Sequence, residues 1–379
     1  MRKDGQVGVR FDSVTNSVSG QAAPPKRPEE ATGDPFGTHR SLAPRGALPQ
    51  PADRLDNDFT RLFRGEMLID VETLNVDAAS FRQMEEAAVA AGEAVEVGVP
   101  LRVRDTVSAR GKQHNRVTGS GGMLLGRVKQ LAAGRPEGER VVVGDRIATL
   151  VSLSLTPLRI DDVRAVRPVS AQLDVSGEAV IFASSPFAIL PSTMPERLAL
   201  AVLDVAGAAP QVTRLAKPGA IVVVLGAGGK SGILCAAEAK KCVGESGIVV
   251  GVEAHAPFAD DLEKLAICNH VVRVDARDPL ATRAAVLRAT GGREGDLVLS
   301  CVNVADVEMS AILCTRARGI TYFFAMSTSF TKAALGAEGV GKDVDLVIGN
   351  GFAEGHAEHT LRMMREHPAI YELFSRRYG

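Results

Sequence analysis

Residues 221–232 read IVVVLGAGGKSG, five apolar residues that run directly into a glycine-rich segment. A short, continuous apolar run is typical of a strand buried on both faces of a parallel sheet. Glycines let the following turn approach a pyrophosphate closely, and the free N–H groups at the start of the next helix bind its charge. The segment therefore predicts a strand, a dinucleotide-binding turn and a helix.

The glycine spacing defines the candidate cofactor residues. It is G-x-x-G-x-x-G at Gly226, Gly229 and Gly232, with Gly228 in addition, and Ser231 stands where G-x-G-x-x-G has its last glycine. We predict that these residues, together with Lys230, hold the cofactor. Gly229-Lys230-Ser231 also matches the end of a nucleoside-triphosphate P-loop, but that motif requires a glycine where Val224 stands. A glycine-rich turn that binds no ligand is the remaining alternative.

Glu253 favours NAD over NADP. It ends the next predicted strand, 21 residues after Gly232. An acid there accepts hydrogen bonds from both ribose hydroxyls of NAD and repels the extra phosphate of NADP. His255 and Arg273 lie close enough in sequence to keep NADP as the alternative.

The chain after residue 195 alternates strand and helix patterns. We predict helices at 196–208, 232–242 and 357–371, and buried strands at 247–253, 270–274, 296–302, 320–325 and 344–348. This alternation predicts an α/β fold with a parallel, doubly wound sheet.

Three polar residues follow the later strands: Asn303, Ser327 and Asn350. Ligands of such sheets lie outside the carboxyl ends of the strands. We therefore expect these residues to hold the nicotinamide ribose and carboxamide, with turn capping as the equal alternative for each.

The first half of the chain differs in its composition and in its pattern of apolar residues. Residues 1–51 are rich in Gly, Pro, Ser and charge without an apolar period, which predicts a wrapping or partly disordered arm. A half-buried strand is predicted at 65–72 and a helix at 78–91. Short strands punctuated by glycine, at 121–128 and 141–150, predict a compact, mainly β unit.

Composition excludes several classes of function. Apolar residues make up 45% of the chain, charged residues 23%, and the net charge is -1, which argues against a protein that neutralises many nucleic-acid phosphates. No apolar run is long enough to span a bilayer, and the N-terminus lacks a signal-peptide core. We expect a cytoplasmic protein with no membrane or nucleic-acid partner.

A basic, glycine-rich loop is the candidate substrate site. It contains Arg110, Lys112, His114 and Asn115 within a few residues. Cations there can pair with a substrate carboxylate, and a histidine near neutrality can take a proton from an amine or alcohol. An exposed basic loop before a strand is the alternative.

The cysteines argue against metal catalysis. A catalytic zinc in a β domain normally needs Cys and His ligands, yet no cysteine precedes Cys235. The five cysteines are an odd number with no C-x-x-C pair, which also argues against a disulfide scaffold. We predict metal-free catalysis.

Three segments carry a resemblance to a superfamily: LNVDAAS at 74–80, VGDRIA at 143–148 and KPG at 217–219. With them the chain resembles the medium-chain dehydrogenase/reductases, and its glycine spacing is similar to the zinc-free quinone-reductase branch. The resemblance implies a Rossmann NAD-binding domain with a smaller, mainly β, GroES-like catalytic domain. We expect an arm at 1–57, the β domain at 58–190, the Rossmann domain at 191–355 and a closing helix at 356–379.

Six further segments narrow the resemblance: 37–40, 48–51, 75–81, 114–124, 148–158 and 226–232, of which HNRVTGSGGML at 114–124 is the most specific. They resemble the L-erythro-3,5-diaminohexanoate dehydrogenase family of lysine fermentation, with Arg116 as a departure where a neutral residue is expected. The resemblance implies an NAD-linked dehydrogenase acting on a CH–NH2 donor. It releases ammonia and 5-amino-3-oxohexanoate.

The family chemistry does not name the base, so roles are assigned from charge type and predicted position. We expect His114 to accept or relay the proton, and Asn115 and Ser80 to orient the amine. Arg110 or Lys112 would hold the carboxylate, and Ser120 would contact the substrate.

Two other functions remain open from the sequence. One is a zinc-independent NAD(P)H reductase of quinones or enoyl compounds, and the other is an NAD-binding protein without turnover. By analogy with similar folds we expect a homo-oligomer, either a dimer or a tetramer.

Overall fold

In the computed structural model, residues 29–30, 32–116, 119–325 and 327–379 are described. The predicted arm before residue 29, and Val117 and Thr118 of the basic loop, lie outside these residues. The chain forms two compact units, one made of Met1–Asp204 with Arg377–Gly379 and the other of Val205–Arg376.

The division falls after Asp204, whereas the sequence pattern predicts it after residue 190. The physical reason is that α3 (Glu196–Leu203) is tied to the first unit. Glu196 pairs with Arg146, and the Arg197 guanidinium lies 3.2 Å from the Asp174 carboxylate.

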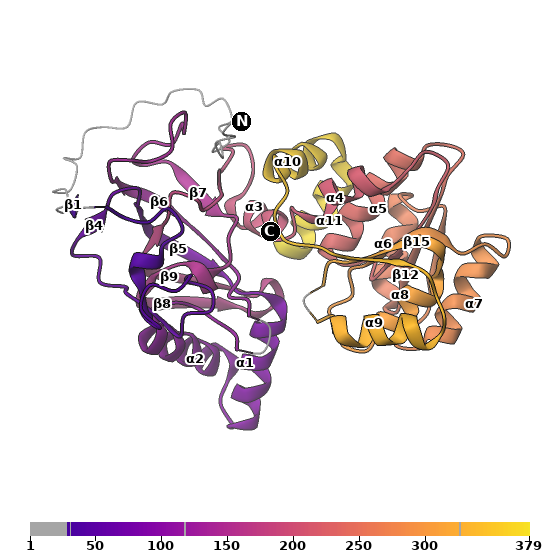
Figure 1. The fold of residues 1–379 in the computed structure, drawn as a ribbon, viewed down its shortest axis with the longest axis horizontal. Coiled ribbons are helices and arrows are strands. Elements are labelled where there is room, and N and C mark those ends of the chain that lie inside the picture. Colours follow the sequence, from indigo (N-terminus) through magenta and orange to yellow (C-terminus); the bar gives the residue numbers. More distant parts are fainter. Residues whose placement is uncertain (1–28, 31, 117–118, 326) are drawn as a thin grey trace. The chain divides into compact units, whose positions relative to one another are not determined.

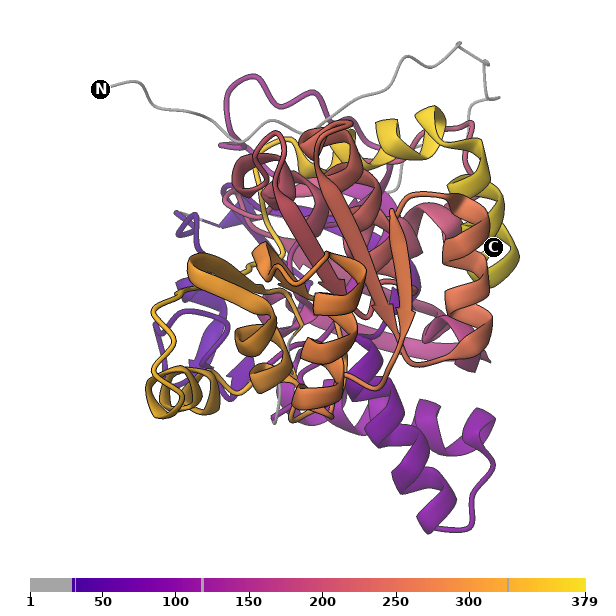
Figure 2. The same cartoon turned by 90° about the vertical axis from the view of Figure 1, so that its right-hand side faces the viewer.

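The second unit is built on a parallel sheet in the order β13-β12-β11-β14-β15-β16. Its strands are β11 (Ile221–Leu225), β12 (Ile248–Glu253), β13 (His270–Arg273), β14 (Gly295–Ser300), β15 (Thr315–Phe323) and β16 (Asp345–Ile348). Every pair is parallel, and Figure 2, which faces this unit, shows neighbouring arrows pointing the same way. The predicted doubly wound sheet is confirmed.

Helices cover both faces of this sheet (Figure 1). They are α4 (Ala208–Leu215), α5 (Lys230–Val243), α6 (Ala256–Leu265), α7 (Pro279–Ala289), α8 (Glu308–Cys314) and α9 (Phe330–Gly339). The chain moves outward from β11 to β13 and then returns across β11 to β14. Because parallel crossovers are right-handed, α5 and α6 cover one face while α7 and α8 cover the other. The reversal point lies between β11 and β14, where such sheets bind their ligands.

Two predicted helices are wrong in extent. The single helix expected at 196–208 is two helices, α3 and α4. Gly207 comes directly before α4 and lies close to Gly351, since a Cβ on Gly207 would lie 2.4 Å from the Gly351 oxygen. The single closing helix is also two, α10 (His356–Glu366) and α11 (Pro368–Tyr378). Pro368 has no N–H to continue α10 but suits the first position of a new helix.

The start of β15 carries a wide irregularity. Gly295 pairs with Thr315 and Leu297 pairs with Ile320, so residues 316–319 lie opposite the single residue Asp296. Within this bulge Arg318 has a φ of 60°, a left-handed conformation that is uncommon for arginine. Bulges redirect side chains, and here the redirected side chains include Arg316 and Arg318.

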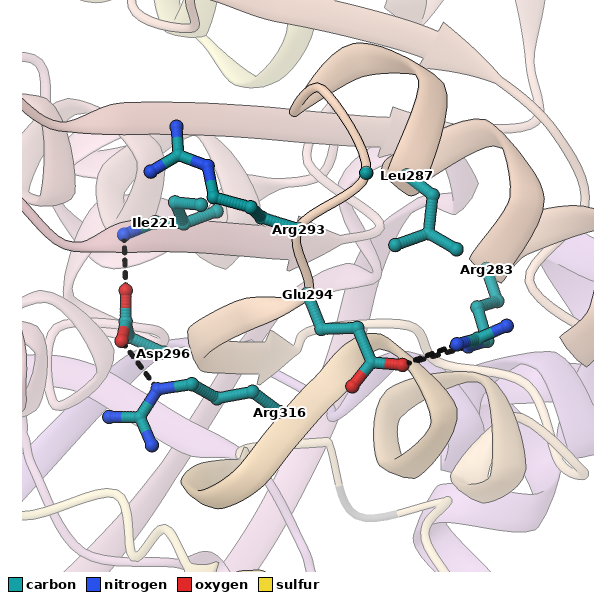
Figure 3. Close-up of a pocket in the computed structure, with 8 residues that line it drawn as sticks. Ile221, Arg283, Leu287, Arg293, Glu294, Asp296 and Arg316 are labelled. Carbon is teal, nitrogen blue, oxygen red and sulfur yellow. Dashed lines mark hydrogen bonds and ion pairs between the residues drawn. The ribbon is translucent and has the colours of Figure 1, made fainter.

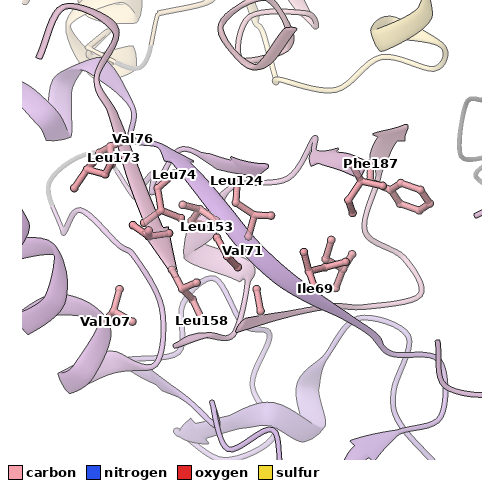
Figure 4. Close-up of a cluster of buried hydrophobic side chains, with 14 of the residues drawn as sticks. Ile69, Val71, Leu74, Val76, Val107, Leu124, Leu153, Leu158, Leu173 and Phe187 are labelled. Atoms are coloured by element: carbon pink, nitrogen blue, oxygen red, sulfur yellow. The ribbon is translucent and has the colours of Figure 1, made fainter. Parts of the chain in front are cut away.

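The first unit contains an antiparallel sheet in the order β10-β7-β6-β5-β9-β8. Its strands are β5 (Met67–Asn75), β6 (Met123–Leu131), β7 (Arg146–Thr149), β8 (Leu158–Arg167), β9 (Gln172–Ile181) and β10 (Phe187–Ile189). Ile69 and Val71 alternate along β5, Leu74 follows a register shift after Val71, and all three are buried in its core (Figure 4). The predicted compact β unit is present, with more strands than the pattern indicated.

Two helices pack on each other beside this sheet. The predicted helix at 78–91 is confirmed as α1 (Ala78–Ala90). The second, α2 (Val95–Arg110), was not predicted, because Pro100 lies inside it and the apolar residues from 95 to 103 alternate as in a strand. Its buried valines are Val99, Val103 and Val107. These three valines nevertheless enter the same core as the sheet.

Residues 37–57 were placed in the arm, yet they contribute buried side chains to the first unit. They include the 3-10 turn Thr38–Arg40, β2 (Ser41–Ala43) and β3 (Arg54–Leu55); β1 (Glu29–Glu30) pairs separately with β4 (Leu62–Phe63). Arg40 and Leu55 are both 0% exposed. Segment 37–57 is therefore an integral part of the β unit.

The described residues also bear on membrane insertion. Among them, no single helix is both long and apolar enough to cross a bilayer; α3 and α4 meet the criterion of length and composition only when counted together across their break.

Candidate functional site

The glycine-rich turn after β11 is shaped for close approach. Gly226 has a φ of 71°, and its N–H and that of Ala227 both donate to the Val252 carbonyl. A Cβ on Gly232 would lie 2.1 Å from the Gly226 oxygen, so only glycine lets α5 pack against the turn. α5 begins at Lys230 without a side-chain cap on Gly229. The start of α5 therefore lies directly after the glycine turn, which is the arrangement of helix N-termini that bind pyrophosphate.

Glu253 lies beside this turn at the end of β12. Its Oε2 accepts a hydrogen bond from the Gly228 N–H at 3.0 Å, and its Oε1 accepts one from the His255 N–H at 3.0 Å. A Cβ on Gly228 would lie 2.8 Å from Oε2, so the extra glycine makes room for the carboxylate. The sequence-predicted turn and acid are thus brought together, and they fit a dinucleotide.

Two of the three polar residues at later strand ends have local partners. Ser327 donates from Oγ to the carbonyls of Val302 and Val304, at 3.1 and 3.2 Å. Asn350 accepts from the Phe352 N–H at 3.1 Å, and Asn303 is exposed. Ser327 and Asn350 therefore cap turns in this structure, and their contact with nicotinamide stays a prediction.

In the first unit, the start of α1 and the basic loop meet in a hydrogen-bonded chain. Asp77 caps α1: its Oδ1 accepts from the Ser80 N–H at 2.9 Å, and its Oδ2 accepts a short hydrogen bond from the Ser80 hydroxyl. The Asn115 amide donates to the Ser80 Oγ at 2.8 Å and to Gln83 Oε1 at 3.1 Å. The structure thus brings together two predicted residues, Ser80 and Asn115, and adds Asp77.

Asp77 has the electrostatic signature of a proton acceptor. Burial raises its pKa above the ordinary value, the Asp204 carboxylate adds to the rise, and hydrogen bonds from Ser80 and Ser120 oppose it. Titratable groups with pKa values shifted toward neutrality gather at catalytic sites. Asp77 is not among the residues predicted from the sequence to form the site. The available signal was an Asp three residues before a serine at a helix start, which also describes an ordinary N-cap.

Arg110 and His114 form a second pair in the loop. The Arg110 guanidinium lies 2.8 Å from His114 Nδ1 and 3.9 Å from an Asp53 carboxylate oxygen. Burial lowers the pKa of His114, and the charges of Lys112 and Arg110 lower it further. Since arginine can only donate, Nδ1 is the acceptor and the neutral ring carries its proton on Nε2. His114 therefore presents a hydrogen-bond donor.

Lys112 is directed to the protein interior. It is 0% exposed, and its ammonium donates to the carbonyls of Pro49 and Gln50 at 2.6 and 3.0 Å. Burial lowers its pKa to about 8, and the neighbouring Arg110 charge acts in the same direction. The structure thus separates Lys112 from the predicted carboxylate-binding role and gives it a fixed place beneath the loop.

Ser120 closes the loop. Its backbone carbonyl accepts from the Asn115 N–H at 2.7 Å, and its side chain bonds to Asp77. The described residues hold no group of three or more His, Cys, Asp or Glu side chains arranged to bind a metal. Metal-free catalysis stays a prediction.

Comparison with known proteins adds a family match to this geometry. Residues 39–191 match the family model of the L-erythro-3,5-diaminohexanoate dehydrogenase N-terminal domain. Two curated relatives with the name L-erythro-3,5-diaminohexanoate dehydrogenase, from Acetoanaerobium sticklandii and Fusobacterium nucleatum, are each 48% identical over 90% of this chain and 98% of their own length.

Solved structures with the same architecture are more distant in sequence. The CurK enoyl reductase aligns with a TM-score of 0.52 at 14% identity, covering 80% of this chain and 79% of its own. The Escherichia coli quinone oxidoreductase aligns with a TM-score of 0.51 at 16% identity, covering 81% and 80%. They confirm the predicted fold class, a Rossmann sheet with a smaller, mainly β unit.

Proposed function

The chain belongs to the L-erythro-3,5-diaminohexanoate dehydrogenase family, and from that membership we propose the reaction it performs. It oxidatively deaminates L-erythro-3,5-diaminohexanoate to 5-amino-3-oxohexanoate and ammonia, with NAD as the hydride acceptor. The observation that carries this proposal is the 48% identity to both relatives over 98% of their length. Neither a quinone or enoyl reductase nor a non-catalytic NAD-binding protein draws comparable support.

The chemistry sets the requirements of the site. The C3 ammonium of the substrate must lose a proton, the C3–H bond must deliver its electron pair and hydrogen as hydride, and water must then hydrolyse the resulting imine to ketone and ammonia. The protein must therefore hold a proton acceptor near the amine and bind the carboxylate at a distance from it.

The direct test follows both products. NADH formation and ammonia release are measured after racemic L- and D-erythro-3,5-diaminohexanoate is added with NAD, and separately with NADP. Ammonia and NADH in a one-to-one ratio are expected. NADH without ammonia, or no turnover despite bound NAD, would contradict the proposed reaction.

We place the proton transfer at Asp77 and Ser80. A hydroxyl has one donor and two acceptor positions. The Ser80 hydroxyl donates to Asp77 and accepts from Asn115, which leaves one acceptor position for the substrate amine. The amine proton passes to Ser80 while the serine proton passes to Asp77, whose raised pKa suits it to accept. Asn115 fixes the serine orientation.

We propose that Arg110 and the Nε2–H of His114 bind the substrate carboxylate. Arg110 is mostly buried, with a side chain 11% exposed, and its only carboxylate among the described residues is Asp53 at 3.9 Å. A guanidinium in such surroundings forms strong, two-point hydrogen bonds with carboxylates. Lys112 supports the loop from below through Pro49 and Gln50.

Replacement of His114 by Gln tests its role. The glutamine amide can place an N–H near the position of the histidine Nε2–H, so we expect kcat/KM to fall by less than about tenfold. The acid limb of the pH profile should stay in place. His114→Leu, which offers no donor, should lose more. Loss of turnover in the glutamine variant, with a changed pH profile, would instead make His114 the proton acceptor.

Glu253 is proposed to select NAD. Because its carboxylate is held beside the turn, it can accept from both ribose hydroxyls and would repel a 2′-phosphate. In Glu253→Ser, kcat/KM with NAD should fall by about 10- to 100-fold, since hydrogen bonds to a charged group are lost, while the value with NADP stays equal or rises. Glu366→Gln, which removes an exposed acid of α10, is the matched control. An unchanged ratio of the two cofactors would remove Glu253 from the selection.

A further inference from the structure

A basic depression lies at the amino ends of β11, β14 and β15. It consists of two adjoining cavities of about 390 Å³ each, which share Asp296 and Arg316 in their walls. Cavities of this size are typical of small-molecule sites. Ile221 begins β11 at this end and Leu225 ends it before the cofactor turn, so the strand separates the two places by about 13 Å at ~3.3 Å per residue.

The charges of the depression are unbalanced. Its walls carry the cations Lys217, Arg283, Arg293, Arg316 and Arg318 against two carboxylates, Glu294 and Asp296. The carboxylates are already engaged. Asp296 accepts from the Ile221 N–H and from Arg316, and Glu294 accepts from Arg283 (Figure 3). Glu294 also accepts from Lys342.

Three cations of the walls remain, namely Arg293, Lys217 and Arg318. Arg293 donates from Nε to the Thr290 carbonyl at 3.3 Å, and its two terminal nitrogens meet no acceptor among the described residues. Lys217 and Arg318 likewise form no ion pair within that part of the chain. In the view of Figure 3, the Arg293 and Arg316 guanidinium groups lie on either side of the Asp296 carboxylate. Positive charge is thus directed at the cavity from more than one wall.

The backbone is built to present these side chains. Arg316 and Arg318 belong to the bulge of residues 316–319, and the left-handed Arg318 is fixed by its N–H, which donates to the Asp343 carbonyl at 2.5 Å. Backbone strain of this kind persists only where the surroundings hold it, and it gathers at ligand sites. Apolar side chains, among them Leu287 and Leu297, line the remaining wall.

We propose that this depression binds a small molecule carrying two or more linked phosphates, at a site separate from the cofactor turn. Arginine guanidinium groups match phosphate oxygens in two-point hydrogen bonds, and a lysine adds a point charge. Linked phosphates supply enough negative charge for all three unpaired cations, and a single phosphate does not. The phosphates come either from an inorganic polyphosphate or from a nucleotide whose less polar part contacts the apolar wall.

The test uses the full chain saturated with NAD, so that the cofactor turn is already occupied. Tripolyphosphate and, separately, ATP without magnesium are titrated calorimetrically at low ionic strength. The variant Arg293→Gln/Arg318→Gln removes two unpaired guanidinium groups and leaves every carboxylate of the depression paired. Arg365→Gln, an exposed arginine on α10, is the matched control.

We expect tripolyphosphate to bind the unmodified chain, and its Kd to rise at least about tenfold in the double variant and less than about twofold in the control. ATP that binds more tightly than tripolyphosphate, and loses affinity by the same factor, would identify a nucleotide as the source. ATP that binds no more tightly would identify phosphate recognition alone. Absence of binding, or equal affinity in the double variant and the unmodified chain, would overturn the proposal. The readout is binding, so it stands apart from turnover.

Discussion

Replacement of Asp77 by Asn is expected to lower kcat by about 10²- to 10⁴-fold, the contribution of a positioned proton acceptor. Asparagine still accepts from the Ser80 N–H at the start of α1, because Asn caps helices as well as Asp does. It cannot take up the amine proton. NAD affinity should be unchanged, since Asp77 belongs to a different unit from the glycine turn.

Stability separates this outcome from misfolding. The raised pKa of Asp77 means that folding disfavours its charged form, so the native state binds the proton more tightly than the unfolded state does. Above that pKa the charge opposes folding, and the neutral asparagine removes the penalty. Urea unfolding of Asp77→Asn should therefore give a free energy equal to that of the unmodified chain or higher.

Two further variants sharpen the experiment. Ser80→Ala should lose turnover by a similar factor, because it breaks the path from amine to carboxylate. Asp70→Asn, which removes a partly exposed acid on β5 bonded to Lys129, should leave kcat unchanged. In the unmodified chain kcat/KM falls as pH drops through the raised pKa of Asp77, and that limb should be absent from the residual activity of Asp77→Asn. Full turnover in that variant would remove Asp77 from the mechanism.

Replacement of Arg40 by Met is expected to cost about 3–5 kcal/mol of unfolding free energy, the cost of leaving one partner of a buried ion pair alone. Arg40 is 0% exposed and donates from Nε and Nη2 to the two Glu66 oxygens, each at 2.8 Å. Its Nη1 donates to Asp56 and to the Asp58 carbonyl, and its Nη2 also donates to the Arg61 carbonyl. Few single changes in this chain should destabilise it more.

Urea unfolding of three variants checks this. Arg40→Met/Glu66→Leu replaces both partners by apolar side chains and should recover much of the loss. Arg82→Met removes an exposed arginine from a helical pair with Glu86, and should change the free energy by less than about 0.5 kcal/mol. An Arg40→Met variant as stable as the unmodified chain would show that the Arg40–Glu66 pair contributes no net stability.

Acidification should also reveal how much the Arg40–Glu66 pair contributes to stability. Burial by itself would raise the pKa of Glu66, but hydrogen bonds from Arg40 and His39 outweigh it and hold the pKa below its ordinary value. A carboxyl with a depressed pKa stabilises the fold above the ordinary value of about 4.5, and this stability is lost as pH falls through the native pKa. Because Arg40→Met lacks most of this depression, its deficit in unfolding free energy relative to the unmodified chain should shrink as pH falls through the native pKa of Glu66.

The sequence predicted the second unit well because its strands and its glycine turn are determined by residues that are close together in the chain. Strands buried on both faces are continuous apolar runs, as in Ile221–Leu225, and the glycine turn with Glu253 follows from spacing along the chain. The boundaries that failed lie where tertiary contacts decide. The helix expected at 196–208 is interrupted between Leu203 and Ala208, and Gly207 there lies against Gly351, a contact that no local pattern reveals.

The candidate catalytic residues were only partly predictable. Ser80 and Asn115 were selected from motif and charge type, and the fold places them 2.8 Å apart. Asp77 was missed because a helix cap and a proton acceptor look alike until burial and the nearby Asp204 are known. Lys112 was misplaced for the opposite reason. Lysine in a basic loop is normally exposed, and only the fold shows that its ammonium points to Pro49 and Gln50.

The burial of segment 37–57 limits how far the chain can be shortened from its N-terminal end. A shortened chain that starts at residue 58 would keep the whole antiparallel sheet but lose the guanidinium facing Glu66, the carbonyls that receive the Lys112 ammonium, and the strand residue Leu55. Two ionised groups would then be enclosed without their counterparts. The latest start that preserves these contacts, together with the hydrogen bond from the Asp34 N–H to the His39 imidazole, lies before Asp34.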